Sequence, residues 1–179
     1  MKLIIVAALA VLLSTSNSIH LAAQKSPKKF GDVSLENLKK KSSNIDSLAG
    51  AEIILDYGYT TFDHNFEIIF YYHGRIKIFN ETEFDRADIE IPHRARDRVE
   101  KLKAATYNLE NGEIVTSEVS RKDVFDEEIN DYQKKKRFSL PNVKKGSIIE
   151  YTYRVNYGGW NSLNPWYFQS SIPSLHSEY

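Results

Sequence analysis

The 179-residue chain contains no cysteine, and this absence excludes several kinds of chemistry. A cysteine nucleophile is impossible, no disulfide bond can form, and a lipid anchor on an N-terminal cysteine is ruled out. A domain of this length buries roughly 68–70% of the surface that its unfolded chain exposes. Its core therefore does not require a disulfide or a metal.

The chain also lacks an excess of either charge. It has 24 basic and 24 acidic residues, and because Lys2 is the only one of them in the first 23 positions, the remainder carries 23 against 24. This balance argues against nucleic acid as a partner. The basic run at residues 134–137 follows an acidic cluster at residues 126–131, and the two together are typical of a solvated segment with alternating charge blocks.

A long hydrophobic run is missing as well. The apolar stretch at residues 3–13 is too short to cross a bilayer, which takes about 20 residues. Lys2 precedes it and Leu21, Ala22 and Ala23 follow it, which predicts a secretory signal peptide at residues 1–23, cleaved near Ala23. We therefore expect a periplasmic or extracellular protein with no stable membrane anchor after cleavage. The alternatives are an N-terminal transmembrane anchor and a core helix.

Residues 66–79 show the clearest pattern in the chain. Apolar and charged side chains alternate with period two, as on the two faces of a strand. The even positions are Phe66, Ile68, Phe70, Tyr72, Ile76 and Ile78, and the polar odd positions are Glu67, His73, Arg75 and Lys77. Because Ile69, Tyr71 and Phe79 are also odd, we expect a long strand at the middle of a sheet, partly covered on its second side.

The remaining elements predict an all-β fold with one short N-terminal helix, capped by Ser34. Strands are expected at residues 51–59, 89–92 (closed by Pro92) and 147–155, with a hairpin about Asn111-Gly112. Residues 124–131 are expected to form a helical turn or a loop. The prediction is a mainly antiparallel β-sandwich or supersandwich at residues 51–179, truncated at its C-terminus, after a tether and helix at residues 24–50.

Sequence motifs for chemistry are weak. No G-x-S-x-G nucleophile elbow occurs, and no histidine pair has a recognisable zinc spacing, although a site assembled across strands from His64, His73 and His93 stays open. We expect no catalytic residue, metal or cofactor. The best interaction candidates are the aromatic residues near the C-terminus, Trp160, Trp166, Tyr167 and Phe168, which could stack on peptide or glycan. The alternative is that they are core, or a face docked against a further domain.

Several motifs, taken in order, resemble one protein family. They are FGDVSLENL at residues 30–38, AEIILD at residues 51–56, IEIP at residues 89–92, KAATYN at residues 103–108, FSLPNVKKGSIIEYTY at residues 138–153 and WYFQSSIP at residues 166–173. The chain resembles the β-rich domain of unknown function that precedes transglutaminase-like domains in exported bacterial proteins. The resemblance covers roughly residues 30–179.

This resemblance implies a position in a larger assembly more than an activity. The family's cysteine, histidine and aspartate triad belongs to the later domain, and a chain without cysteine cannot supply it. We expect a non-catalytic accessory or interaction module whose partner is a downstream transglutaminase-like domain in cis, or another exported protein. The alternatives are an N-terminal fragment of a transglutaminase-like, peptidase-type enzyme and a stand-alone peptide- or glycan-binding module.

Overall fold

The computed structural model describes residues 26–158 and 165–179, so the predicted signal peptide lies outside the described residues. The elements, in chain order, are α1 (Leu35–Lys39), β1 (Ala51–Phe62), β2 (Ile68–Ile78), the 3-10 helix η1 (Glu81–Ala87), β3 (Asp88–Arg94), β4 (Arg98–Glu110), β5 (Glu113–Glu118), the 3-10 helix η2 (Arg121–Asp123), β6 (Phe125–Asn130), β7 (Gln133–Ser139), β8 (Ile148–Tyr157) and β9 (Ser177–Glu178). Within these ranges, no helix combines the length and the hydrophobicity needed to cross a membrane.

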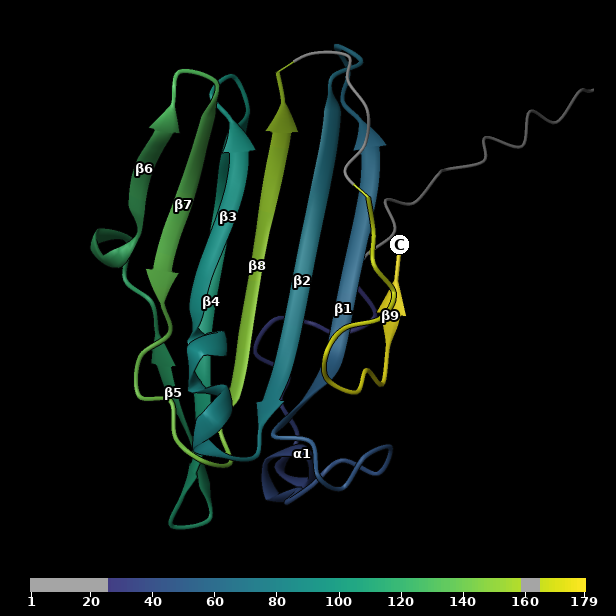
Figure 1. Cartoon of the computed structure of the whole chain (residues 1–179), viewed down its shortest axis with the longest axis vertical. Helices are drawn as coiled ribbons and strands as arrows, with labels where there is room; N and C mark the ends of the chain where they lie inside the picture. The colour runs from purple at the N-terminus through teal and green to yellow at the C-terminus, as the bar shows by residue number, and fades with distance from the viewer. Residues whose placement is uncertain (1–25, 159–164) are drawn as a thin grey trace, which may run out of the picture.

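Two sheets make up the protein. The large sheet has six strands in the order β5-β4-β8-β2-β1-β9, and the small sheet has three in the order β3-β7-β6 (Figure 1). All pairings are antiparallel except that of β9, which runs parallel to β1 at Asp56 and Tyr57. The long strand expected from the alternation is confirmed, because β2 lies between β1 and β8 near the middle of the large sheet. It begins at Ile68, so Phe66 and Glu67 precede it.

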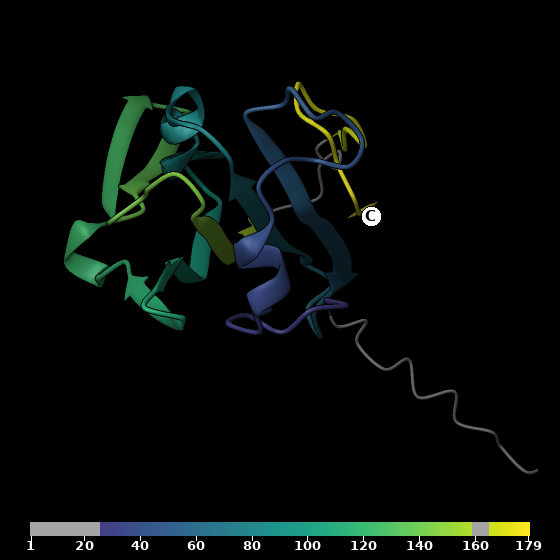
Figure 2. The same cartoon turned by 90° about the horizontal axis from the view of Figure 1, so that it is seen from below.

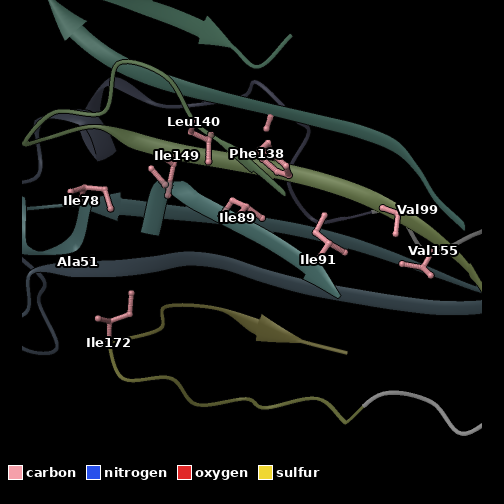
Figure 3. Close-up of a cluster of buried hydrophobic side chains, with 12 residues drawn as sticks. Ala51, Ile78, Ile89, Ile91, Val99, Phe138, Leu140, Ile149, Val155 and Ile172 are labelled. Atoms are coloured by element: carbon pink, nitrogen blue, oxygen red, sulfur yellow. The ribbon is translucent and has the colours of Figure 1, made fainter. Parts of the chain in front are cut away.

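One face of the large sheet packs against the small sheet, and the main core lies between them. The end-on view shows the green strands of the small sheet standing apart from the blue strands β1 and β2 (Figure 2). Side chains from both sheets fill the interior, among them Ile89 and Ile91 of β3, Phe138 of β7 and Ile149 of β8 (Figure 3). The predicted class, mainly antiparallel β with one short α-helix, is confirmed.

Local sequence signals explain several boundaries. Asn111 and Gly112 both have positive φ, 51° and 87°, and close the β4–β5 hairpin as the Asn-Gly pair predicted. Ser34 caps α1 by accepting a hydrogen bond from the backbone N–H of Asn37 at 3.2 Å. Pro92 does not end its strand, since β3 continues to Arg94; β3 lies at an edge of the small sheet, where a missing N–H is tolerated.

The charged segment after η2 differs from its prediction. It forms the β6–β7 hairpin rather than a helical turn or a loop. The acidic residues of β6 face the basic residues of β7 in register, so that Lys134 contacts Glu128 at 2.6 Å and Lys136 contacts Asp126 at 2.6 Å. The charge blocks that indicated a solvated segment are cross-strand partners.

The second face of the large sheet is covered by residues 26–50, here called the N-terminal strap. Val33 and Leu38 of the strap are buried against Ile54, Tyr107 and Ile148 of the sheet. The central strands are therefore buried on both sides. This explains why the polar side chains at the odd positions of β2, His73, Arg75 and Lys77, are almost inaccessible to solvent.

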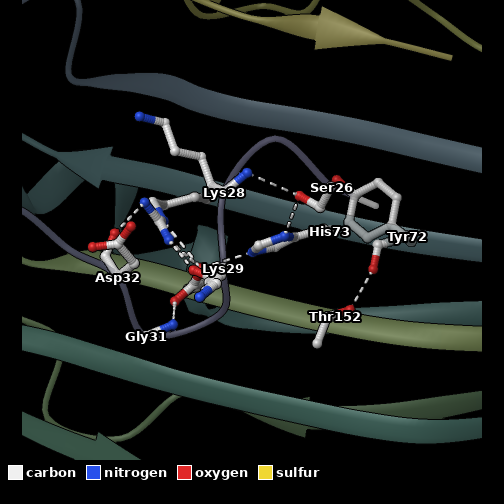
Figure 4. A network of polar contacts seen from close by, with 10 residues as sticks. Ser26, Lys28, Lys29, Gly31, Asp32, Tyr72, His73 and Thr152 are labelled. Carbon is white, nitrogen blue, oxygen red and sulfur yellow. Dashed lines mark hydrogen bonds and ion pairs between the residues drawn. The ribbon is translucent and has the colours of Figure 1, made fainter. Parts of the chain in front are cut away.

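A buried carboxylate fixes the strap to the sheet. Glu150 of β8 is fully buried, and its Oε1 accepts hydrogen bonds from His73 Nε2 at 2.7 Å and from Arg75 Nη2 at 2.5 Å (Figure 4). Its Oε2 accepts from the backbone N–H of Gly31 in the strap at 2.9 Å. Burial alone would raise the pKa of Glu150, but the bonds from His73 and Gly31 and the charge of Arg75 lower it overall. The carboxylate is therefore ionised in the folded protein.

Arg75 also binds the backbone of the strap, and a second buried carboxylate holds the strap near its other end. Arg75 also donates to the carbonyl oxygens of Asp32 at 2.8 Å and Lys29 at 3.0 Å. Near the other end of the strap, the buried carboxylate of Glu52 accepts from Lys40 Nζ at 2.5 Å and from Ser43 Oγ at 2.5 Å. The strap is thus held by buried charges that each have a specific partner.

Replacing Glu150 with glutamine should reveal how much this network stabilises the fold. The substitution keeps the side-chain volume but leaves Arg75 buried without a counter-charge, which should lower the free energy of unfolding at pH 7 by about 3 kcal/mol. The folded-state pKa of Glu150 lies below the ordinary value of 4.5. The difference in free energy of unfolding between the wild type and Glu150→Gln is therefore complete above pH 4.5, and it is lost as the pH falls through the folded-state pKa. Urea denaturation of both proteins between pH 7 and pH 3 measures the difference.

The matched control is Glu110→Gln, which removes the exposed ion pair with Lys144, 2.8 Å apart. We expect it to change the free energy of unfolding by less than about 1 kcal/mol. Equal costs for the two substitutions would contradict a stabilising role for the buried network. So would a Glu150→Gln difference that stays constant down to pH 3.

Candidate functional site

The face of the large sheet opposite the strap is lined by aromatic rings. The Tyr72 ring stacks on Tyr153 with centroids 5.1 Å apart and lies 5.3 Å from Tyr151. Tyr72 donates its hydroxyl hydrogen to Asp56 Oδ1 at 2.9 Å. Burial raises the pKa of Tyr72 well above its ordinary value and raises the pKa of Asp56 as well. The phenols on this face are therefore neutral groups that provide packing surface and hydrogen bonds.

The C-terminal segment lies against these rings. Trp166 stacks on Tyr179 with centroids 5.3 Å apart and planes 11° from parallel. Trp166 Nε1 donates to Ser177 Oγ at 3.2 Å, and Ser177 in turn donates to Asp56 Oδ2 at 3.1 Å. Gly58 of β1 permits this approach, because a Cβ there would lie 2.5 Å from the Trp166 ring. The position of the segment thus depends on the space left by Gly58 and on the hydrogen bond to the Asp56 carboxylate.

Between the two sheets lies an open groove of about 470 Å³, here called the inter-sheet groove. Its floor consists of Phe70 from β2 and of Tyr153, Val155 and Tyr157 from β8. The opposite wall includes Ile91 of β3, together with Pro92 and with Ile129 of β6. A volume of this size and an apolar, aromatic lining are typical of ligand-binding clefts.

Charged groups form the rim of the inter-sheet groove. His93, Arg94 and Lys134 line it, with Asp97 as the acidic member. Asp97 accepts hydrogen bonds from the backbone N–H of Arg94 at 3.2 Å and of Gly158 at 3.2 Å, so it also fixes the β3–β4 turn. The rim can orient a polar ligand, but it contains no nucleophile.

A second arrangement has the connectivity of a serine-histidine-acid relay. Ser26 Oγ lies 2.7 Å from His73 Nδ1, and His73 Nε2 lies 2.7 Å from Glu150 Oε1 (Figure 4). However, Arg75 already neutralises Glu150, and the His73 ring is buried beneath the strap. His73 also projects from the face of β2 opposite the inter-sheet groove, because residues of odd and even number alternate. We interpret the relay geometry as part of the attachment of the strap.

The structure separates the histidines from which a metal site was considered. His64 is exposed in the β1–β2 turn, His73 is buried under the strap, and His93 lies on the rim of the inter-sheet groove. Among residues 26–158 and 165–179, no group of three or more histidine, aspartate or glutamate side chains could hold a metal ion.

The aromatic residues singled out in the sequence fall in different environments. Trp160 lies outside the described residues. Trp166 packs among the rings of the large sheet, whereas Tyr167 and Phe168 are exposed to 76% and 57%. Their role in ligand binding stays a prediction. Sequence reasoning missed the inter-sheet groove. The signal that could have indicated it was the alternation of Tyr153, Val155 and Tyr157 along β8, all of which line the groove.

The fold and the groove together define a two-sheet, mainly antiparallel β domain with an open cleft between its sheets. Residues 64–179 match the model of a family described as a domain of unknown function with solved structure, DUF3857. The match covers more than half of the chain, which therefore belongs to this family. The family expected from the sequence motifs is thereby confirmed.

One solved structure shows the same fold. It is the crystal structure of a protein named "putative protease" from Parabacteroides distasonis ATCC 8503, 11% identical to this chain with a TM-score of 0.51. The similarity covers 62% of this chain but 24% of the other protein, so the chain spans about a quarter of that protein's length. No curated protein matches the chain.

The contact between Gly58 and Trp166 can be tested with a double-mutant cycle. Gly58→Ala should lower the free energy of unfolding by about 1–3 kcal/mol, because the added Cβ meets the indole ring. In a Trp166→Ala background the clash with the indole is absent and the closest remaining atom is Tyr179 Cδ2 at 2.8 Å. The same substitution should therefore cost less in that background, with a coupling energy of about 1 kcal/mol. Denaturant unfolding of the four proteins gives the cycle. Additive costs would contradict the packing of Trp166 over β1.

Proposed function

We propose that the protein is an exported, non-catalytic binding module that accompanies a transglutaminase-like, peptidase-type domain, in the same chain or as a separate exported protein. Membership of the family supports an accessory role, as does the similarity to a quarter of a protein named as a protease. The absence of cysteine is consistent with this, because the chain cannot itself supply a cysteine triad.

The observation that carries the proposal is the separation of the two faces of the large sheet. Of the groups that could perform chemistry, His73 and Glu150 are buried beneath the strap, and Ser26, itself a residue of the strap, is hydrogen-bonded to His73. The accessible inter-sheet groove on the other face instead offers aromatic rings, apolar side chains and a charged rim. The groove that could bind a ligand is thus accessible, whereas the potentially reactive groups attach the strap to the sheet.

An extended peptide is the occupant that best fits the inter-sheet groove. The groove is open, and the wall opposite the aromatic floor includes Ile91 of β3, an edge strand of the small sheet, beside residues of β6 and of the central strand β7. Edge strands present unpaired backbone groups with which an extended chain can form hydrogen bonds, while its side chains contact the floor. In this role the module would hold a peptide for the accompanying domain.

Substitution of Ile129 tests the groove. This residue lines the groove from β6 and is 51% exposed, so Ile129→Glu places a charge there without disturbing the core. We expect tryptic peptides of β-casein to shift backbone amide NMR signals of residues 91–94 and 153–157 in wild-type protein, and Ile129→Glu to abolish the shifts. Ile114→Glu is the matched control, since Ile114 is 38% exposed on β5 and does not line the groove.

Three outcomes would contradict the proposal. The first is equal binding of the peptides by both variants. The second is shifts with the glycan chitotetraose but none with the peptides, which would favour a glycan-binding module. The third is hydrolysis of fluorescent casein by the purified chain that is lost in Ser26→Ala, since this would show that the relay of Ser26, His73 and Glu150 is catalytic. Thermal unfolding of each variant establishes that it is folded before binding is measured.

A further inference from the structure

A second cleft lies at the end of the large sheet where α1 and the β4–β5 turn are found (Figure 1). It encloses about 910 Å³ and is lined by residues 38–41, the end of the β4–β5 hairpin and the turn before β8. We call it the basic cleft. It is separate from the inter-sheet groove, with which it shares no lining residue.

The lining of the basic cleft is strongly biased towards positive charge. Five lysines line it and Glu110 is its one acidic lining residue; the lysines are Lys39, Lys40, Lys41, Lys144 and Lys145. Within the described part of the chain, Lys40 is paired with Glu52 and Lys144 with Glu110, while Lys39, Lys41 and Lys145 form no ion pair. In a protein with no net charge, this concentration creates a local positive potential.

A buried lysine lies directly behind the cleft. Lys77 of β2 is fully buried, and its Nζ donates to the carbonyl oxygens of Leu38 at 2.7 Å and Gly146 at 2.5 Å, both residues of the cleft lining. An ammonium group has three hydrogens to donate, and among the residues that the structure describes this one meets two acceptors and no carboxylate. Burial, and secondarily the charge of Lys40, lower the pKa of Lys77 to about 8. Its cross-strand partner on β1 is Glu52, whose carboxylate accepts from Lys40 and Ser43 instead. Because no carboxylate contacts Lys77 Nζ directly, a bound anion would reduce the cost of burying this cation.

We propose that the basic cleft binds a multivalent anion that carries phosphoryl groups. Lysine is a compact point charge that suits the tetrahedral phosphoryl group, and the cleft contains no arginine fork of the kind that favours a planar carboxylate. The volume exceeds that of a single phosphate, and the lysines come from two segments, residues 39–41 and residues 144–145. Both facts point to a ligand with at least two charged groups.

Calorimetric titration with pyrophosphate at low salt is the direct test. We expect saturable binding to the wild-type protein, and binding weakened about tenfold or more by Lys41→Gln combined with Lys145→Gln, because each removes a charge-assisted contact from one side of the cleft. Lys103→Gln combined with Lys122→Gln is the matched control: it removes the same charge from exposed lysines that do not line the cleft. The control should bind as the wild type does.

The titration of Lys77 distinguishes a specific site from general attraction to lysines. Pyrophosphate bound in the cleft should raise the pKa of Lys77, measured by NMR of labelled lysine side chains.

The proposal is overturned by any of three results: no binding at millimolar pyrophosphate, equal loss of binding in the cleft and control variants, or citrate binding as tightly as pyrophosphate. Flotation with phosphatidylglycerol and phosphatidylcholine vesicles then separates the sources. If the protein floats with phosphatidylglycerol vesicles but not with phosphatidylcholine vesicles, and the cleft variant does not float, the ligand is a lipid headgroup. If the protein binds pyrophosphate but floats with neither vesicle, the ligand is a soluble phosphoryl compound.

Discussion

The contact of one buried carboxylate with a guanidinium and an imidazole sets the architecture of this domain. Glu150, Arg75 and His73 lie on adjacent central strands, and together they bind the backbone of the N-terminal strap. Without that interaction the second face of the large sheet would expose the charged side chains that the strap buries. With it, the strap seals one face, and the opposite face is left to form the core and the inter-sheet groove. The resulting domain therefore has one face of the large sheet covered by the strap and the other bearing the inter-sheet groove.

Period-two alternation made the centre of the fold predictable. It indicated the position of β2, and the Asn111-Gly112 pair indicated the β4–β5 hairpin, because both depend on local backbone geometry. The β6–β7 hairpin was not foreseen, since its strands carry facing blocks of acidic and basic residues and not the apolar alternation that predicts a strand. Pro92 was wrongly expected to end its strand, because edge position is a property of the whole sheet and not of the local sequence.

The candidate sites were less accessible to sequence reasoning than the fold. The groove requires β8 to face β3 and β6 across the interior, and the basic cleft requires the segment after α1 to meet the turn before β8. No local sequence motif predicts that these elements lie next to each other in the fold. The partial covering of the odd face of β2 was foreseen, but the covering segment was not, because it lies about 45 residues away in the sequence, as in the contact of Arg75 with Lys29. Exposed aromatics at Tyr167 and Phe168 were recognisable only by residue type.

The central claim is that the strap is an integral part of the folded domain, held by Glu150. Native-state hydrogen exchange at the backbone amide of Gly31 tests it most directly, because that N–H donates to the buried carboxylate at 2.9 Å. The account predicts slow exchange in the wild-type protein, with a free energy of opening close to that of global unfolding, and much faster exchange in Glu150→Gln. Rapid exchange of the Gly31 amide in the folded wild-type protein would contradict the account, since it would mean that the strap opens independently of the sheet.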